Sequence, residues 1–313
     1  MWFFYIFLFL KVFIVGADPH IQVKLNVVAV HIGESNGYGY SMTNPAYRVA
    51  YLRALRRFPD TLRNMTLQTI YEPGDLSCAE AEAVMPLLSL RVRKALERYD
   101  GFGVIISPGC SQEMLILGDF AREWNVPLLT SIGGDSQLQD RVRLPTVITM
   151  PASDQLSIGR ATKALLDRFA WRNLVILCDL LYTTWYTRTC DILTVDLKIF
   201  LCLRSQKIPT VGTVGWQSFD GDDEDARSAF QTVILIHKPN PNWANIADLQ
   251  ATIADLTLRE YNKTLTDDEY ANDNAISAYE TVAALTYVSM THAECSERFA
   301  VDVTLDAHVT FGL

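Results

Sequence analysis

The sequence predicts an α/β protein in which parallel strands alternate with helices and the chain forms two lobes. Three observations carry this prediction. Short apolar runs alternate with helix-length segments through the first half of the chain. Glycine and proline stand at the ends of the apolar runs, where turns between strands and helices are expected. The alternation begins again after residue 150, and 313 residues suffice for two lobes.

The first lobe is the more regular of the two. The run at 23–30 alternates at first and is then continuously apolar, which is typical of a strand buried on both faces. After a glycine-rich turn, Val49, Leu52 and Leu55 recur at helical spacing within a helix expected at 45–58. The other expected elements of this lobe are strands at 66–71, 103–107, 126–131 and 145–151 and helices at 78–98 and 111–124.

A second lobe is expected to begin with a helix at 155–170, followed by a strand at 174–178. The pattern thins beyond Leu203, and the segment 209–225 contains no clear helix. Later expected elements are a strand at 233–236 and helices at 222–230, 245–262 and 272–291. We therefore expect a first lobe at 18–150, a hinge near 145–151, a shortened second lobe at 151–270, and a helix and strand at 271–313 that return toward the first lobe.

Residues 1–17 predict a secretory signal peptide. They are mostly aromatic and aliphatic, and small residues precede Asp18 at the positions that a signal peptidase reads. Lys11 interrupts the apolar run, so a membrane anchor or a buried strand is the alternative. The six cysteines lack metal-ligand spacing and fit an oxidising compartment. Asn64 and Asn262 begin Asn-X-Thr triplets, which predict N-glycosylation.

The charge balance and the motifs restrict the function. The chain carries 36 acidic and 27 basic residues, a net charge of −9, which disfavours a nucleic acid and suits a cationic peptide or a basic protein. No zinc-protease motif or phosphate-binding loop occurs in the sequence. We expect no catalytic site, no metal site and no organic cofactor, and hence a binding protein.

Two stretches resemble the ANF-receptor ligand-binding region, the family of natriuretic peptide receptors and receptor guanylate cyclases. The first is Ser107-Pro108-Gly109-Cys110 with the later segment 124–130, Trp-Asn-Val-Pro-Leu-Leu-Thr. The second is the acidic segment 216–239. The likeness covers most of 23–291. It implies a two-lobed fold of the type I periplasmic-binding-protein kind, dimerisation through the first lobe, and an extracellular ligand resembling a peptide hormone.

The resemblance also implies particular site residues. It pairs Cys78 with Cys110 in a disulfide, and it suggests a chloride held by the backbone of Gly109 and Cys110, although Tyr71 replaces the serine that completes the family's site. Ligands of open α/β folds bind at the carboxyl ends of parallel strands. We therefore expect the wall of the ligand cleft to contain Ser107, Gly109, Cys110, Ser131 and Gly133.

The departures from the family leave alternatives. A central strand–helix–strand unit of the second lobe is missing near 201–215, where Cys202 could replace the family partner of Cys190. Given the predicted signal peptide, we expect the chain to be secreted as written. If it is part of a longer receptor, we expect it to lie on the extracellular side of the plasma membrane. The alternatives are a small-molecule sensor of the amino-acid type, the sensory fragment of a receptor guanylate cyclase, and an incomplete gene model.

Overall fold

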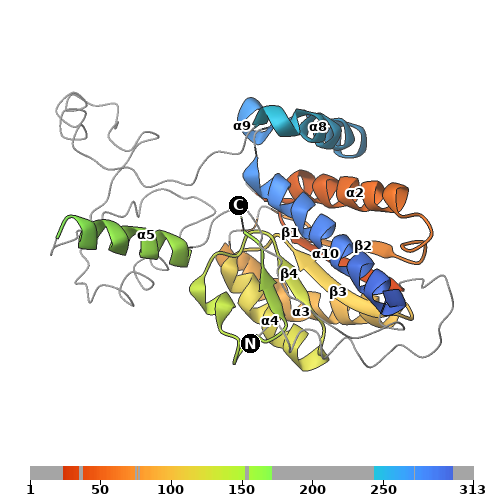
Figure 1. Ribbon diagram of the computed structural model, residues 1–313, viewed down its shortest axis with the longest axis horizontal. Coiled ribbons are helices and arrows are strands. Elements are labelled where there is room, and N and C mark those ends of the chain that lie inside the picture. The colour runs from red at the N-terminus through yellow and green to blue at the C-terminus, as the bar shows by residue number, and fades with distance from the viewer. Residues whose placement is uncertain are drawn as a thin grey trace.

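The computed structural model describes residues 24–34, 38–74, 76, 78–151, 155–170, 243–270 and 272–298. The signal peptide, the Cys178, Cys190 and Cys202 positions, the acidic segment 216–239 and most of the second lobe expected between 171 and 242 lie outside these residues. The described residues therefore form mainly the first lobe and the helices that pack on it (Figure 1).

Five strands of the described residues form one sheet in which every neighbouring pair is parallel. Their order across the sheet is β2-β1-β3-β4-β5. The strand β1, which lies between β2 and β3, is buried at all eight residues, as expected for a strand covered on both faces. The strand bounds are β1 Leu25–Ile32, β2 Thr66–Glu72, β3 Phe102–Ser107, β4 Leu128–Thr130 and β5 Val147–Thr149.

Helices cover both faces of this sheet and make three layers (Figure 1). On one face lie α2 (Tyr40–Arg57), α8 (Ala247–Tyr261) and α10 (Asp273–Arg298). On the other lie α3 (Cys78–Glu97) and α4 (Ser111–Trp124). The short elements are η2 (Ser136–Gln139), η3 (Trp243–Ile246) and α9 (Asp267–Tyr270), and α5 (Gln155–Arg168) lies apart from the three layers, beyond the carboxyl ends of the strands.

The alternation of side chains along β1 produces two separate cores. Val27 and Ala29 point into the core beneath α2, α8 and α10, where Tyr47 is fully buried. Val28 and Val30 point into the core beneath α3 and α4. Burial of each large apolar side chain in such a core stabilises the fold by roughly 1.5–3 kcal/mol.

The strand order reverses direction once, between β1 and β3. The chain leaves β1 through α2 toward the β2 edge, and it leaves β3 through α4 toward the β4 edge. The loops that follow β1 and β3 therefore part from each other at the carboxyl ends of the strands, and in open α/β sheets the ligand crevice is expected between such loops. This reversal positions the candidate site.

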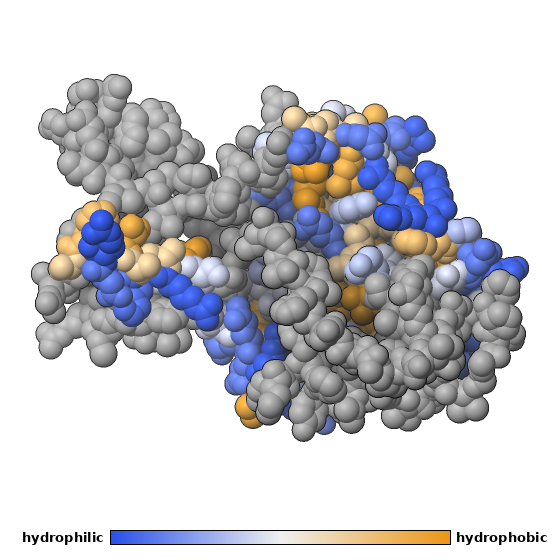
Figure 2. Space-filling model, in the orientation of Figure 1, coloured by the Kyte–Doolittle hydropathy of each residue, from blue (hydrophilic) through white to orange (hydrophobic). Residues whose placement is uncertain are grey.

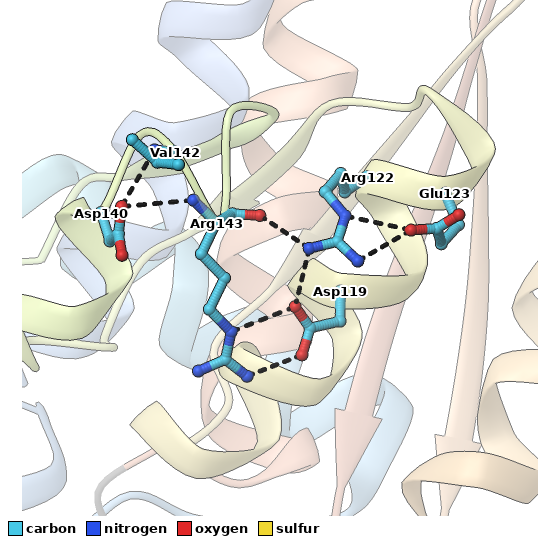
Figure 3. A network of polar contacts seen from close by, with 6 residues as sticks. All are labelled: Asp119, Arg122, Glu123, Asp140, Val142 and Arg143. Atoms are coloured by element: carbon cyan, nitrogen blue, oxygen red, sulfur yellow. Dashed lines mark hydrogen bonds and ion pairs between the residues drawn. The ribbon is translucent and has the colours of Figure 1, made fainter.

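An ion-pair network holds the loop before β5 onto α4 (Figure 3). Asp119 of α4 accepts two hydrogen bonds from the Arg143 guanidinium, at 3.2 and 2.6 Å. Arg122 donates to the Arg143 carbonyl at 3.1 Å, and the Asp140 carboxylate accepts the backbone N–H groups of Val142 and Arg143. These groups are partly exposed, so each pair contributes about 1 kcal/mol or less, and their main effect is to fix the position of the loop.

The helix α8, which the sequence predicts to lie in the second lobe, packs against α2 of the first lobe. Leu249 and Ile253 of α8 lie in the core beneath α2, and Arg53 of α2 pairs with Asp248 at 2.9 Å. α10 packs beside α2 as well. The spacing of apolar residues predicts an amphipathic helix, but it does not say which lobe buries the apolar face.

Most expected elements of the first lobe are confirmed, with shifted ends. α4 has the expected bounds, whereas α2 begins at Tyr40 rather than at Pro45, which lies inside the helix. The Glu34 carboxylate accepts the backbone N–H and the hydroxyl of Ser41, and this contact stabilises the earlier start. α10 runs on to Arg298 rather than ending at 291. None of the described helices is long and apolar enough to span a bilayer.

Candidate ligand-binding site

The turn that follows β3 is fixed by the side chain of Ser107. The Ser107 hydroxyl donates to the carbonyl of Val30 in β1 at 2.9 Å, and it accepts the N–H of Gly109 at 3.2 Å. The buried Ser107 side chain thus bonds both to the neighbouring strand β1 and to the backbone within the turn. Because buried polar groups are costly unless they are hydrogen-bonded, this arrangement allows a polar turn to lie beneath the surface.

The end of β4 is joined directly to this turn. The Ser131 N–H donates to the Ser107 carbonyl at 3.2 Å, and the Ser131 hydroxyl lies 3.3 Å from the hydroxyl of Tyr47. Gly133 donates its N–H to the Thr130 hydroxyl at 3.2 Å. The structure therefore brings the residues predicted for the cleft wall to one edge of the sheet, at the carboxyl ends of β3 and β4.

Sequence reasoning missed Glu113, which lies beneath the turn and is only 2% exposed. Its carboxylate accepts the backbone N–H of Cys110, the residue that precedes the first turn of α4. A Glu three residues after the cap residue is half of a capping box, but the cap is normally Ser or Thr and here it is Cys. Burial raises the pKa of Glu113 to about 8, while the hydrogen bond from Cys110 lowers it.

Glu113 also explains the glycine in the turn. A Cβ atom on Gly109 would lie 2.6 Å from the Cε atom of Met114 and closer still to the Glu113 carboxylate. Any larger residue would have to displace the buried Glu113 carboxyl group and the end of the Met114 side chain. Gly109 is therefore required for the close approach of the turn to the helix, a role different from the conformational freedom that glycine gives elsewhere.

The donor groups at the predicted chloride site already have hydrogen-bond acceptors within the protein. The N–H of Gly109 is bonded to the Ser107 hydroxyl, and the N–H of Cys110 is bonded to the Glu113 carboxylate. The hydroxyl of Tyr71, at the third position, donates to Glu34 at 3.0 Å. A chloride would have to displace these acceptors, so chloride binding here stays a prediction. In the described part of the chain no cluster of side chains suited to a metal ion is found.

Cys110 is disulfide-bonded, and its sulfur lies 2.6 Å from the hydroxyl of Tyr38. The backbone of Cys78 begins α3, but its side chain lies outside the described residues. The Cys78–Cys110 pairing therefore stays a prediction.

An aromatic cluster borders the site on the β1–β2 side. The rings of Tyr40 and Tyr71 stack with centroids 4.1 Å apart, and Tyr261 meets the Tyr40 ring edge-on at 5.2 Å. Beneath them the buried ring of His31 contacts Tyr40 at 5.3 Å, and burial lowers the pKa of His31 to about 3. The exposed carboxylate of Glu34 lies beside this cluster, and the Lys263 ammonium lies 3.5 Å from the Ser41 hydroxyl that Glu34 binds.

The buried carboxyl group of Glu113 predicts a specific pH dependence of stability. The pKa of about 8 in the folded state lies above the ordinary value of 4.5, so the folded protein binds the proton more tightly than the unfolded chain does. The free energy of unfolding should therefore fall as the pH rises from 4.5 to 8, by about 1.4 kcal/mol for each unit between the two pKa values, and level off outside this window.

Glu113→Gln should remove most of this decrease, because a glutamine keeps the acceptor for Cys110 without ionising. Urea unfolding at a series of pH values measures the effect. Glu82→Gln, an exposed glutamate of α3, is the matched control and should follow the unmodified protein. Equal slopes for Glu113→Gln and the unmodified protein between pH 5 and pH 8 would contradict the assignment.

Comparisons with known proteins fit this geometry. Residues 45–191 match the ANF receptor family model, described as the receptor family ligand binding region. The chain is 25% identical over 178 residues to gamma-aminobutyric acid type B receptor subunit 1 of Mus musculus, and equally to that of Rattus norvegicus. It is 28% identical over 74 residues to the receptor-type guanylate cyclase gcy-8 of Caenorhabditis elegans.

These matches cover limited parts of the proteins compared. The first two cover 56% of this chain and 17% of the receptor subunit, and the third covers 24% of this chain and 6% of the cyclase. They confirm the resemblance that the segment 107–130 indicates, at the level of the family. Residues 45–191 are therefore similar to the ligand-binding region of a receptor family.

Proposed function

We propose that this chain is the extracellular ligand-sensing region of a receptor, and that its ligand binds against the 107–110 turn. The observation that carries the proposal is the hydrogen bond from the Ser131 N–H to the Ser107 carbonyl. It joins the ends of β3 and β4 beside the point where the strand order reverses, and ligands of open α/β sheets bind at such a point. A second lobe closing on this edge would transmit the signal if the ligand binds the closed arrangement more tightly.

The charges near this edge favour a cationic ligand. The chain has a net charge of −9, and the exposed carboxylate of Glu34 lies beside the stacked rings of Tyr40 and Tyr71. Tyrosine faces and a carboxylate both attract ammonium and guanidinium groups. A peptide hormone rich in Lys and Arg is therefore our first candidate. The similarity to a receptor-type guanylate cyclase favours a receptor of that kind, with any cyclase outside the printed sequence.

An amino acid is the second candidate. The longest of the three matches is to a receptor subunit whose name specifies gamma-aminobutyric acid. A small zwitterion would have to replace internal hydrogen bonds of Ser107, Ser131 and the turn amides with its own. Both candidates carry a cationic amine, so charge does not separate them and direct titration is needed.

Titration calorimetry with cationic peptides and with single amino acids tests the proposal. We expect a cationic peptide to bind, and Gly109→Ala to weaken that binding about tenfold or more, equivalent to about 1.4 kcal/mol, because the added methyl displaces Glu113 and the turn. Gly103→Ala is the matched control. It adds the same methyl to β3 against the flexible end of Leu96, away from the carboxyl edge, and should leave the affinity unchanged.

Each outcome of this titration has a distinct meaning. Equal losses in the two glycine variants would contradict binding at the turn. Binding of an amino acid with no binding of the peptides would replace the first candidate by the second. Absence of binding to both classes would contradict both ligand proposals.

We further propose that two copies of the chain pair through α3. Leu87 and Leu90 lie one turn apart on α3 and are 69% and 60% exposed, and the exposed Ala83 and Pro86 lie beside them, so this face of α3 is apolar. Both predicted glycosylation sites are exposed and follow helices of the opposite layer, since Asn64 follows α2 and Asn262 follows α8. The α3 face is therefore free of predicted glycans, and a second copy presents the same apolar pair.

Leu87→Glu should weaken this dimer, because it places two like charges at the centre of a symmetric contact. We expect the dissociation constant in analytical ultracentrifugation to rise about tenfold or more. Leu258→Glu is the matched control, since Leu258 lies on α8 and is 50% exposed. A monomeric unmodified protein, or equal effects of the two substitutions, would contradict pairing through α3.

A further inference from the structure

The end of the first lobe opposite the candidate ligand site carries a group of exposed cations. Helices that flank a parallel sheet end near the amino ends of its strands. The last turns of α2 and α3 therefore lie at the amino ends of the strands, opposite the candidate ligand site. In Figure 2 hydrophilic residues gather at the right-hand end of the molecule, over the end of α2. We name the group the basic end, and its members are Arg56, Arg57, Arg63, Lys94 and Arg98.

Hydrogen bonds bring the three segments of the basic end together. The turn between α2 and β2 is compact, since Leu62 donates its N–H to Phe58 at 3.1 Å and Met65 to Leu62 at 2.9 Å. The side chain of Asn26 joins this turn to α3, because it accepts from Thr66 at 3.1 Å and donates to the Ala95 carbonyl at 3.1 Å. The arginines of α2 and of the turn therefore share one edge with the cations of α3.

The cations of the basic end are not neutralised by the described residues around them. The nearby carboxylates are already engaged, since Asp100 pairs with Lys24 at 3.1 Å and Glu97 pairs with Arg93 at 2.5 Å. None of the five cations forms an ion pair with a residue that the structure describes. An additional carboxylate, Asp60, lies in the turn, which leaves the basic end with a clear positive excess.

Two of the guanidinium groups are held over aromatic rings. The Arg57 guanidinium lies 5.2 Å from the centroid of Phe58, and that of Arg98 lies 6.0 Å from the centroid of Tyr99. Such stacking restricts the side chain while its N–H donors remain open to solvent. Oriented guanidinium groups bind the oxygens of sulfate and phosphate esters with two parallel hydrogen bonds.

We propose that the basic end binds an extended polyanion, specifically a sulfated polysaccharide. A positive surface in a protein of net charge −9 is contrary to the overall balance, and clustered like charges repel one another unless a partner compensates them. The cations come from three segments rather than from one pocket, which fits a linear chain of anions better than a single ion. The choice of a sulfated polysaccharide rests on the extracellular location in the proposed function.

This binding is independent of the ligand crevice. The basic end lies at the amino ends of the strands, whereas the 107–110 turn lies at their carboxyl ends. A polysaccharide bound there would leave the crevice accessible and would concentrate the receptor on a matrix or cell surface. A failure of polysaccharide binding would therefore leave the proposed ligand site untouched, and the reverse also holds.

The test is the affinity of the full chain for heparin, measured by biosensor at several salt concentrations. Because Asn64 lies beside Arg63, all proteins carry Asn64→Gln so that no glycan masks the basic end. We expect the parent protein to bind and Arg56→Gln/Arg98→Gln to bind at least about tenfold more weakly. The slope of log affinity against log salt should decrease by about one for each cation that contacts a sulfate.

Arg160→Gln/Arg168→Gln is the matched control, because it removes two exposed arginines from α5 and changes the net charge equally. It should bind heparin as the parent does. Equal weakening in the two double variants would show a general charge effect and would overturn the proposal. So would the absence of heparin binding by the parent, or equal binding of fully desulfated heparin. Circular dichroism confirms that the variants are folded.

Discussion

The parallel pairing of β1 with β3 is the constraint on which the rest of the structure depends. Residues Leu25 to Ala29 lie opposite Phe102 to Ile106, and the Ser107 hydroxyl extends the contact by bonding the carbonyl of Val30. Because the chain leaves these two strands in opposite directions, the ligand crevice is expected at their carboxyl ends. A shift in this register would move the turn, the two cores and the start of α4 together.

The polar groups at the crevice are satisfied before any ligand arrives. Ser107, Ser131 and the turn amides bond mainly to one another, and the buried carboxyl group of Glu113 bonds to the start of α4. A site of this kind is rigid, since each group is held by a neighbour from a different element. The ligand therefore meets a preformed edge, and the adaptable part of recognition is expected at the tyrosine cluster and on the second lobe.

Helix ends could be predicted from the sequence where residues close in the sequence determine them. α4 was placed correctly because Pro108 and Gly109 precede it and because Asn125, in the left-handed conformation, and Pro127 follow it. The start of α2 was missed because Pro45 looks like a first helical residue, whereas Glu34 stabilises an earlier start.

Long-range contacts could not be predicted in the same way. The contact of Arg53 with Asp248 joins residues 195 positions apart. The sequence of α8 alone therefore does not indicate which part of the protein α8 packs against. In the candidate site, the strand-end rule predicted Ser107, Gly109 and Ser131, and the structure places all three at the carboxyl edge of the sheet. Glu113 was missed because its cap residue is a cysteine, and the tyrosine cluster was missed because Tyr40, Tyr71 and Tyr261 meet only after folding.

The central claim is that ligand binds at the carboxyl edge of the sheet, against the 107–110 turn. Amide hydrogen exchange of the full chain, with and without the tightest-binding peptide or amino acid of the titration, tests this claim most directly. We expect ligand to slow exchange at 107–114 and 131–133 and to leave the basic end unchanged. Slower exchange confined to the basic end, or to α8 and α10, would contradict the claim.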